Sequence, residues 1–340
     1  MIVVMAAHAT ADQIKDVEKR IADWGYGVHP IYGTERTVIG ATGVPEADKS
    51  RYMESLEALP YVEQVMGIIR PYKFASREFH PAGTVIDVKG IPVGGNRIAL
   101  MAGPCTVETY EQTWESAVAC KAAGATILRG GAYKPSTSPY SFQGHGVPAL
   151  EILRDIADKL DMRVITEVMD VRNVELVCRY ADILQIGTRN MQNYDLLREV
   201  GKVQTPVMLK RGMTAKIEEW LQAAEYVLLG GNPNVMLCER GIRTFETYTR
   251  NTLDLSAVPA VKELSHLPII VDPSQGTGKR SLVEAMTRAS VAVGADGLLI
   301  EVHPHPDQAL KDGAQQITTD GIGPLVESLK PIAQAIGRSI

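Results

Sequence analysis

The chain has 340 residues and a formal net charge of −5 at pH 7, which argues against nucleic acid as its main partner. No apolar run approaches the roughly 18–20 residues that a membrane helix needs, so a membrane partner is not expected either. The four cysteines form no CxxC pair and the first residues carry no basic leader, which favours a cytoplasmic protein with reduced thiols.

Residues 1–70 predict a small separate domain. Two amphipathic segments in this part of the chain predict helices, the first capped by Thr10 and the second beginning at Pro45. Apolar runs predict four strands, at residues 1–6, 28–32, 36–41 and 61–69. The resulting order, strand, helix, strand, strand, helix, strand, is that of a ferredoxin-like α+β domain.

The rest of the chain predicts an α/β architecture, a (β/α)8 TIM barrel. Residues 71–83 are rich in aromatic and charged side chains and predict a linker that docks on a neighbouring surface. Residues 84–340 predict the catalytic domain, which begins with a hairpin at 84–95 that covers the N-terminal end of the barrel. Eight apolar runs predict the barrel strands, within residues 98–105, 125–134, 163–167, 181–189, 206–211, 234–240, 268–275 and 297–304.

Side chains at the ends of these strands predict the position of an active site. The C-terminal ends of barrel strands open on one face, so the side chains that follow them converge around one mouth. The converging residues are Cys105, Arg129, Lys134, Glu167, Arg189, Lys210, Arg240 and Glu301.

Cations are concentrated at this mouth. Burying so many positive charges together without anions would be very costly, so we expect a small, multiply anionic substrate. The alternative is internal pairing with Glu167, Glu239, Glu301 and Asp272, which would account for some of the cations. The predicted cluster consists of Arg129, Lys134, Arg189, Lys210, Arg211, Arg240 and Arg243.

A second group combines a thiol with carboxylates. Cys105, Glu301 and Asp312, with His303 and His305 nearby in sequence, are residue types that can hold a divalent cation. Their spacing fits no local metal-binding motif, so such a site would be assembled only by the fold.

Nine short motifs in order resemble one enzyme family along essentially the whole chain. The family is that of 3-deoxy-D-arabino-heptulosonate 7-phosphate (DAHP) synthase, and the resemblance is to type I-beta members with an N-terminal ferredoxin-like domain. The motifs are AGPC (102–105), LRGGAYKP (128–135), SPYSFQG (138–144), QIGTRN (185–190), LKRG (209–212), CERGIRTFE (238–246), VDPS (271–274), EVHP (301–304) and KDG (311–313).

This resemblance implies a transferase that condenses phosphoenolpyruvate with erythrose 4-phosphate, at the start of the shikimate pathway to aromatic amino acids. It implies that Arg189 and Arg240 bind the phosphate of phosphoenolpyruvate, and that Arg129, Lys134 and Lys210 bind its carboxylate. Lys134 would also protonate the carbonyl oxygen of the acceptor. The remaining implied substrate-binding residues are those that follow Lys134, namely Pro135, Ser136 and Thr137.

The resemblance also implies a divalent metal, a regulatory ligand and an oligomer. Cys105, Glu301 and Asp312 match three of the four expected metal ligands, and Cys105 and Glu301 thereby count among the catalytic residues. An aromatic amino acid is the expected allosteric effector at the N-terminal domain, and a homotetramer is the expected assembly.

The chain departs from the family pattern at three positions. Gln275 stands where the family has the fourth metal ligand, a histidine. A neutral amide oxygen is a harder and weaker donor than imidazole, so we expect weakened binding with Mn²⁺ or Mg²⁺ favoured, or activity without metal. Ser136 replaces an arginine that helps to bind erythrose phosphate, at a typical loss of about 10- to 150-fold in affinity. Thr188 stands where alanine is usual.

These departures leave alternatives open. Every cation assigned to phosphoenolpyruvate is present, whereas the two larger departures affect the metal and the acceptor. One alternative is a paralogue with a different aldehyde acceptor or metal dependence. Another is a catalytically weakened protein that binds a regulatory ligand, and a third is a related synthase that acts on a longer phosphorylated aldose. The ferredoxin-like domain argues against the third.

Overall fold

The structure is a computed structural model that describes residues 1–32, 36–67, 71–135 and 138–340. It divides into two compact units, Met1–Pro71 and Tyr72–Ile340. The predicted Ser136 and Thr137 lie outside the described residues. In the described part of the chain, no helix is both long and apolar enough to cross a membrane.

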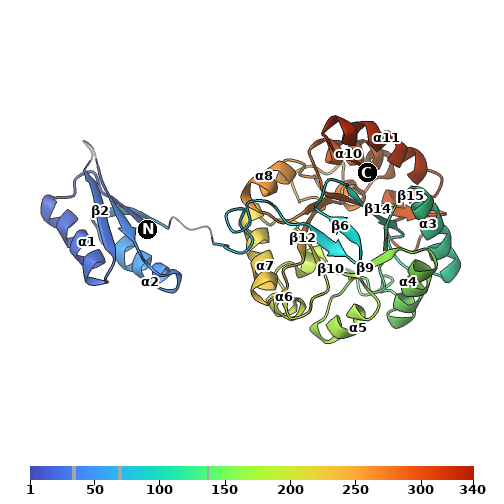
Figure 1. Cartoon of the computed structure of the whole chain (residues 1–340), viewed down its shortest axis with the longest axis horizontal. Helices are drawn as coiled ribbons and strands as arrows, with labels where there is room; N and C mark the ends of the chain where they lie inside the picture. The colour runs from blue at the N-terminus through green and yellow to red at the C-terminus, as the bar shows by residue number, and fades with distance from the viewer. Residues whose placement is uncertain (33–35, 68–70, 136–137) are drawn as a thin grey trace. The chain divides into compact units, whose positions relative to one another are not determined.

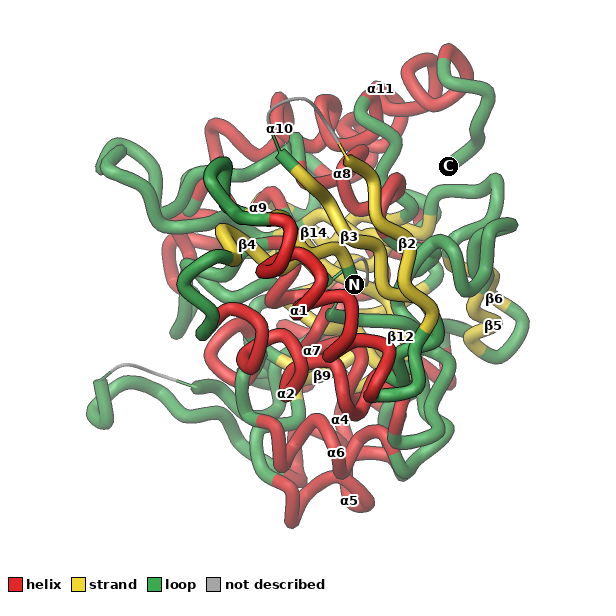
Figure 2. Tube along the Cα trace, turned by 90° about the vertical axis from the view of Figure 1, so that its left-hand side faces the viewer, coloured by secondary structure: helices red, strands yellow, loops and turns green. Residues whose placement is uncertain are grey.

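The first unit has the predicted ferredoxin-like order. Its four strands form one antiparallel sheet in the order β2-β3-β1-β4. Both helices pack on the same face of this sheet around buried side chains such as Val3, Ile21 and Leu56 (Figure 2). The elements are β1 (Ile2–Met5), α1 (Ala11–Asp23), β2 (Gly27–Tyr32), β3 (Thr37–Thr42), α2 (Glu46–Glu57) and β4 (Val62–Met66). Thr10 caps α1 through a capping box with Gln13, as its position predicted.

The second unit is the predicted TIM barrel (Figure 1). Eight parallel strands pair in sequence order, and β13 pairs with β14 to close the ring. The strands are β7 (Ala99–Gly103), β8 (Ile127–Arg129), β9 (Arg163–Glu167), β10 (Ile183–Ile186), β11 (Val207–Lys210), β12 (Val235–Glu239), β13 (Ile269–Val271) and β14 (Gly297–His303). Each lies within its predicted run and is buried along its length, apart from Arg163 at the start of β9.

Helices surround this ring of strands (Figure 1). Their apolar sides and the outward-facing side chains of the strands form one large core. The helices are α3 (Tyr110–Ala122), α4 (Val147–Lys159), α5 (Val174–Cys178), α6 (Tyr194–Gly201), α7 (Ile217–Leu229), α8 (Ala257–Leu264), α9 (Pro273–Thr277), α10 (Arg280–Ala292) and α11 (Ile322–Ala335). A two-residue strand, β15 (Ile317–Thr318), extends the sheet beside β14.

A hairpin closes the end of the barrel where the strands begin. It consists of β5 (Ile86–Val88) and β6 (Ile91–Val93). Three of its apolar side chains share a core with the inward-facing residues of the barrel strands. Arg163, at the start of β9, donates hydrogen bonds to the carbonyl oxygen of Lys89 in the turn. The opposite end, where the strands finish, is therefore the one left for a site.

The segment before the hairpin is held on the barrel, as its composition predicted. Three successive backbone N–H groups, those of Lys73, Phe74 and Ala75, donate to the carboxylate of Glu225 on α7 at 2.9 Å each. The ring of His266 bonds both to the carbonyl of Phe74 and to the hydroxyl of Thr84.

Candidate active site

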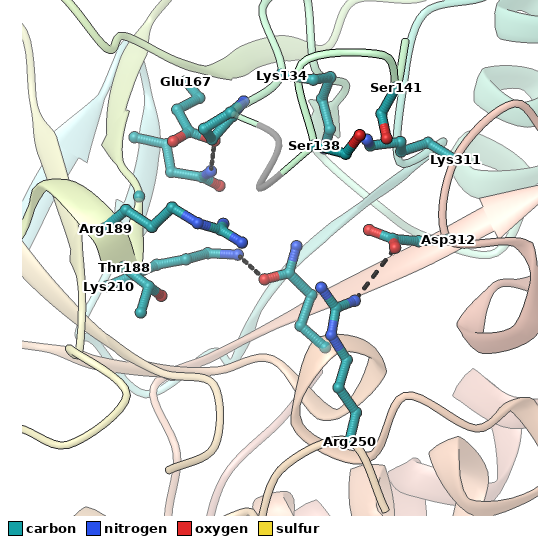
Figure 3. A pocket seen from close by; sticks show the side chains of 14 residues that line it. Lys134, Ser138, Ser141, Glu167, Thr188, Arg189, Lys210, Arg250, Lys311 and Asp312 are labelled. Atoms are coloured by element: carbon teal, nitrogen blue, oxygen red, sulfur yellow. Dashed lines mark hydrogen bonds and ion pairs between the residues drawn. The ribbon is translucent and has the colours of Figure 1, made fainter. Parts of the chain in front are cut away.

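A cavity of about 280 Å³ lies where the barrel strands end. Side chains from most of these strand ends and from the loops that follow them face it (Figure 3). The lining residues are Lys134, Pro135, Ser138, Ser141, Glu167, Gln185, Gly187, Thr188, Arg189, Lys210, Arg250, Gln275, Lys311 and Asp312. Seven of the predicted site residues line this cavity, namely Lys134, Pro135, Glu167, Arg189, Lys210, Gln275 and Asp312.

Two glycines let the charged side chains approach the backbone of the site. A Cβ atom built on Gly187 would lie 2.0 Å from Oε1 of Glu167, and one on Gly131 would lie 2.4 Å from Cδ of Lys134. Both distances are shorter than real Cβ contacts, so a larger residue at either position of the QIGTRN and LRGGAYKP motifs would force the side chain of Glu167 or Lys134 to move. Close packing of Lys134 and Glu167 against the backbone therefore explains the glycines at positions 131 and 187 of these motifs.

Three of the predicted cations, namely Lys210, Arg129 and Arg211, are paired with buried carboxylates. Nζ of Lys210 lies 2.7 Å from Oδ2 of Asp272, and Nη1 of Arg129 lies 3.2 Å from Oε1 of Glu301. All four side chains are almost completely buried. The internal pairing that was the alternative to substrate binding therefore accounts for Lys210 and Arg129 in part.

Arg240 lacks such a carboxylate partner. It is only 4% exposed, and neither Nε nor Nη1 has a hydrogen-bond partner among the residues that the structure describes. Its Nη2 donates to Oε1 of Gln275 at 3.2 Å. Burial lowers the pKa of Arg240 below its ordinary value. A buried guanidinium with two unpartnered nitrogens favours an anionic ligand, because an unsatisfied buried charge is costly.

Lys134 lies against the thiol of Cys105. Its Nζ donates to the carbonyl oxygen of Cys105 at 3.1 Å and to Sγ at 3.2 Å. Burial disfavours the ammonium, but the neighbouring Cys105, Glu301 and Glu167 outweigh it, so the pKa of Lys134 is raised. The side chain is therefore a charged proton donor at neutral pH.

Glu167 faces the same cavity from the end of β9. Its Oε2 accepts from Nε2 of Gln185 at 3.3 Å, while the buried Oε1 has no hydrogen-bond partner in the described part of the chain. Burial raises the pKa of Glu167, against the effect of the surrounding cations Lys134 and Lys210.

The predicted metal ligands are close together but each is engaged by other donors. Sγ of Cys105 lies 3.5 Å from Oδ2 of Asp312, and burial, with the nearby Glu301, raises the pKa of Cys105 to about 11. Oδ1 of Asp312 accepts from Arg250 at 3.2 Å. Among the described residues, no three His, Cys, Asp or Glu side chains are arranged to hold a metal ion. The donor set as it stands does not fit a divalent metal.

Gln275, where the family pattern has a ligand, takes part in a different network. Its Oε1 accepts from Nζ of Lys210 at 3.4 Å and from Nη2 of Arg240 at 3.2 Å. Its Nε2 lies 3.5 Å from Oε1 of Glu301. The amide thus connects two cations of the site to a buried carboxylate.

Other predicted residues lie outside the cavity. Arg211 is buried between Glu239 at 2.9 Å and Asp254 at 2.8 Å, so its role is structural. Arg243 is exposed and lines a separate hollow beside Arg189. His303, which does not line the cavity, faces Glu108, with its Nε2 3.5 Å from Oε2 of that carboxylate.

Three charged or polar residues around the site, Arg250, Gln315 and Lys311, were not predicted as site residues. Arg250 points into the cavity from the loop after β12 and contacts Asp312 and Gln315 (Figure 3). Nε2 of Gln315 donates to Oε2 of Glu301 at 2.7 Å. Lys311 lines the rim opposite Lys210 (Figure 3). Lys311 stood inside the KDG motif, whereas Arg250 and Gln315 follow no strand directly and carried no positional signal.

Comparisons with known proteins agree along the whole chain. The model of the DAHP synthetase I family matches residues 83–335, and the model of the DAHP synthase ferredoxin-like domain matches residues 1–70. A phospho-2-dehydro-3-deoxyheptonate aldolase from Thermotoga maritima is 48% identical over 337 residues, which is 99% of each chain. A 2-dehydro-3-deoxyphosphooctonate aldolase from Geobacter sulfurreducens is 29% identical over 73% of this chain and 97% of its own.

Solved structures agree as well. The crystal structure of the Thermotoga maritima DAHP synthase matches with a TM-score of 0.89 at 47% identity, over 99% of this chain and 98% of that one. A truncated form of the synthase from the same organism matches with a TM-score of 0.74, over 79% of this chain and 99% of its own.

Proposed function

Because the chain belongs to the DAHP synthetase I family, as its motifs predicted, we propose that it condenses phosphoenolpyruvate with erythrose 4-phosphate. The observation that carries this proposal is the buried Arg240, whose Nε and Nη1 have no partner among the described residues and which shares the amide oxygen of Gln275 with Lys210, a residue that lines the cavity. A ligand with two anionic groups would satisfy these cations.

In this proposal the two ends of phosphoenolpyruvate bind to different cations. Arg240 and the exposed Arg189 hold the phosphate, since guanidinium groups bind phosphate oxygens in a bidentate manner. Arg129, Lys134 and Lys210 hold the carboxylate, and they are the cations whose charge is partly balanced by Glu301 and Asp272. This division fits the charges of the two groups, because a carboxylate carries less negative charge than a phosphate and needs less positive charge to balance it.

The chemistry follows from this placement. C3 of phosphoenolpyruvate forms a bond to the aldehyde carbon, and the aldehyde oxygen takes a proton from Lys134. A water oxygen then bonds to C2 and loses both of its protons, one replacing the proton that Lys134 gave and one going to the departing phosphate, and the C2–O bond to phosphate breaks, which leaves a ketone and inorganic phosphate. The barrel contributes orientation and fixed positive charge around the reacting anions.

In this proposal Pro135 and Lys311, which line the cavity, bind the acceptor, together with Ser136 and Thr137, which the family resemblance assigns to substrate binding. With serine at 136, Lys311 is the described cation at the rim that is placed to meet a terminal phosphate (Figure 3). A paralogue with a changed acceptor remains the second candidate, because the departure at Ser136 falls on the acceptor side alone.

The test is phosphate release from phosphoenolpyruvate with a series of acceptors. Erythrose 4-phosphate, unphosphorylated erythrose and a five-carbon aldose phosphate should be compared at equal concentrations. We expect erythrose 4-phosphate to give the highest kcat/KM. A higher value with either other sugar would assign the chain to a changed acceptor, and no release with any of them, with phosphoenolpyruvate still bound, would indicate a regulatory protein.

The remaining expectations concern regulation, assembly and location. An aromatic amino acid as effector of residues 1–70, a homotetramer and a cytoplasmic location are proposals that rest on the family and on the match of that domain. Inhibition assays with phenylalanine, tyrosine and tryptophan and light scattering of the purified chain test the first two.

A further inference from the structure

We propose that this site works without a bound divalent metal, and that Gln275 is the residue that keeps such a metal out. The inference rests on the proposed condensation and specifies how the site performs it. The family resemblance gives the positions of the expected metal ligands, and the hydrogen-bond directions around Gln275, Glu301 and Asp312 carry the inference.

The first observation is the direction of the Gln275 amide. Lys210 and Arg240 can only donate hydrogen bonds, so the atom of Gln275 that faces both must be the oxygen. The NH2 group consequently faces Glu301, with Nε2 at 3.5 Å from Oε1. An amide nitrogen with two hydrogens has no lone pair available for a metal ion, so at this position the chain presents a donor where a ligand would be needed.

The second observation is that both carboxylate oxygens of the buried Glu301 already have partners, one a cation and one a neutral amide donor. Nη1 of Arg129 lies 3.2 Å from Oε1, and Nε2 of Gln315 donates to Oε2 at 2.7 Å. The side chain is completely buried. A buried carboxylate needs compensation by charge or hydrogen bonds, and here the chain supplies both without a metal.

The third observation concerns the charges that a metal would meet. Arg250 pairs with Asp312 at 3.2 Å, and Nζ of Lys134 lies 3.2 Å from Sγ of Cys105. A divalent ion at these ligands would lie among Arg129, Lys134 and Arg250, and its repulsion from them would be strong in a buried site. Lys134 itself supplies positive charge to the reaction, because it is placed to stabilise and protonate the aldehyde oxygen.

The test is a titration of the full-length, chelator-treated protein with Co²⁺, followed by absorbance. A Co²⁺ ion bound to the Cys105 thiolate gives a sulfur-to-metal charge-transfer band, which reports on the site independently of turnover. The wild type, Gln275→His and, as a matched control, Gln275→Asn are titrated side by side. Phosphate release from phosphoenolpyruvate and erythrose 4-phosphate is measured in parallel, with and without chelator.

We expect no charge-transfer band from the wild type or from Gln275→Asn. Gln275→His should gain one ion per chain, with affinity raised at least about 100-fold, since even partners outside the first coordination shell contribute 10- to 100-fold. Phosphate release by the wild type should be unchanged by chelator and by added Mn²⁺.

The inference is overturned if the wild type shows the band with one Co²⁺ per chain, or if chelator abolishes its phosphate release and Mn²⁺ restores it. A folded Gln275→His that gains no Co²⁺ overturns the role given to Gln275. If Gln275→His does not fold, the wild-type titration alone decides. Wild-type protein that releases no phosphate under any condition contradicts the proposed function. Its Co²⁺ titration still tests whether the site binds a metal, because the charge-transfer band does not depend on turnover.

Discussion

A single amide oxygen, that of Gln275, accepts hydrogen bonds from both Lys210 and Arg240. This contact is the only one that the buried Nη2 of Arg240 makes among the described hydrogen bonds, and its two other nitrogens make none. Lys210, in contrast, has the full charge of Asp272 at 2.7 Å. The two cations therefore differ in what they require from a ligand: Arg240 is the residue whose burial is compensated least by the protein itself.

Replacement of Arg240 should consequently affect binding of phosphoenolpyruvate more than folding. We expect Arg240→Ala to raise the dissociation constant for phosphoenolpyruvate by about 10- to 150-fold, the range for loss of one charge-assisted contact. Isothermal calorimetry without an acceptor measures this directly. The matched control is Arg243→Ala, which removes an exposed arginine outside the cavity and should change affinity less than about 3-fold. Equal effects of the two substitutions would contradict the assignment.

The burial of Glu167 predicts that its contribution to the stability of the folded protein changes with pH. Burial raises the pKa of this carboxyl above the ordinary 4.5, so the folded protein holds the proton more tightly than the unfolded chain. The stabilisation that results is complete at acid pH and is lost as the pH rises through the folded pKa. We expect Glu167→Gln, which resembles the protonated form, to gain thermal stability relative to the wild type as the pH rises from about 4.3 towards neutrality. A difference in Tm that is constant or shrinks over this range would contradict the prediction.

At the scale of elements, the site depends on the junctions between the barrel strands and the loops that follow them. Most of the functional side chains stand at strand ends. Gly187 directly follows β10 and Gly131 lies two residues after β8, where they leave room for Glu167 and Lys134. The barrel strands could be predicted because they are buried β-branched runs of regular spacing. Arg250 and Gln315 could not be predicted as site residues, because each reaches the site from a loop. Arg250 bonds to Asp312 and Gln315 bonds to Glu301, and only the fold brings these pairs together.

Gly187 allows a test of this close packing. Gly187→Ala would place a Cβ atom 2.0 Å from Oε1 of Glu167, so we expect it to lower both Tm and kcat. The double variant Glu167→Ala, Gly187→Ala removes the clashing carboxylate and should recover stability, with a coupling of about 0.5–3 kcal/mol between the two positions. Additive effects of the two substitutions on stability would show that the contact is not the cause.

At the scale of the whole molecule, the chain combines two units with separate cores. The order of elements in the first unit and the barrel of the second were predictable, because each depends on local hydrophobic periodicity. The state of the metal ligands was not: Cys105, Glu301 and Asp312 looked like three ligands of four, and only their contacts with Lys134 and Arg250 distinguish a paired network from an open coordination site.

The two units predict separable functions. A variant that begins at Tyr72 keeps every described residue of the cavity and the segment held by Glu225, so it should retain condensation activity. It should lose inhibition by aromatic amino acids, which full-length protein is expected to show. The solved truncated form of the Thermotoga maritima synthase supports the choice of this boundary, since it covers 79% of this chain. Inhibition that persists in the shortened variant would place the effector in the barrel.

The most direct test of the proposed reaction is the mass of what the purified wild type makes from phosphoenolpyruvate labelled with ¹⁸O at the bridging oxygen and unlabelled erythrose 4-phosphate. The account predicts a seven-carbon phosphorylated sugar acid without label and one labelled inorganic phosphate per product, because the C2–O bond breaks. Label retained in the sugar acid, or phosphoenolpyruvate that is bound but left intact, would contradict it.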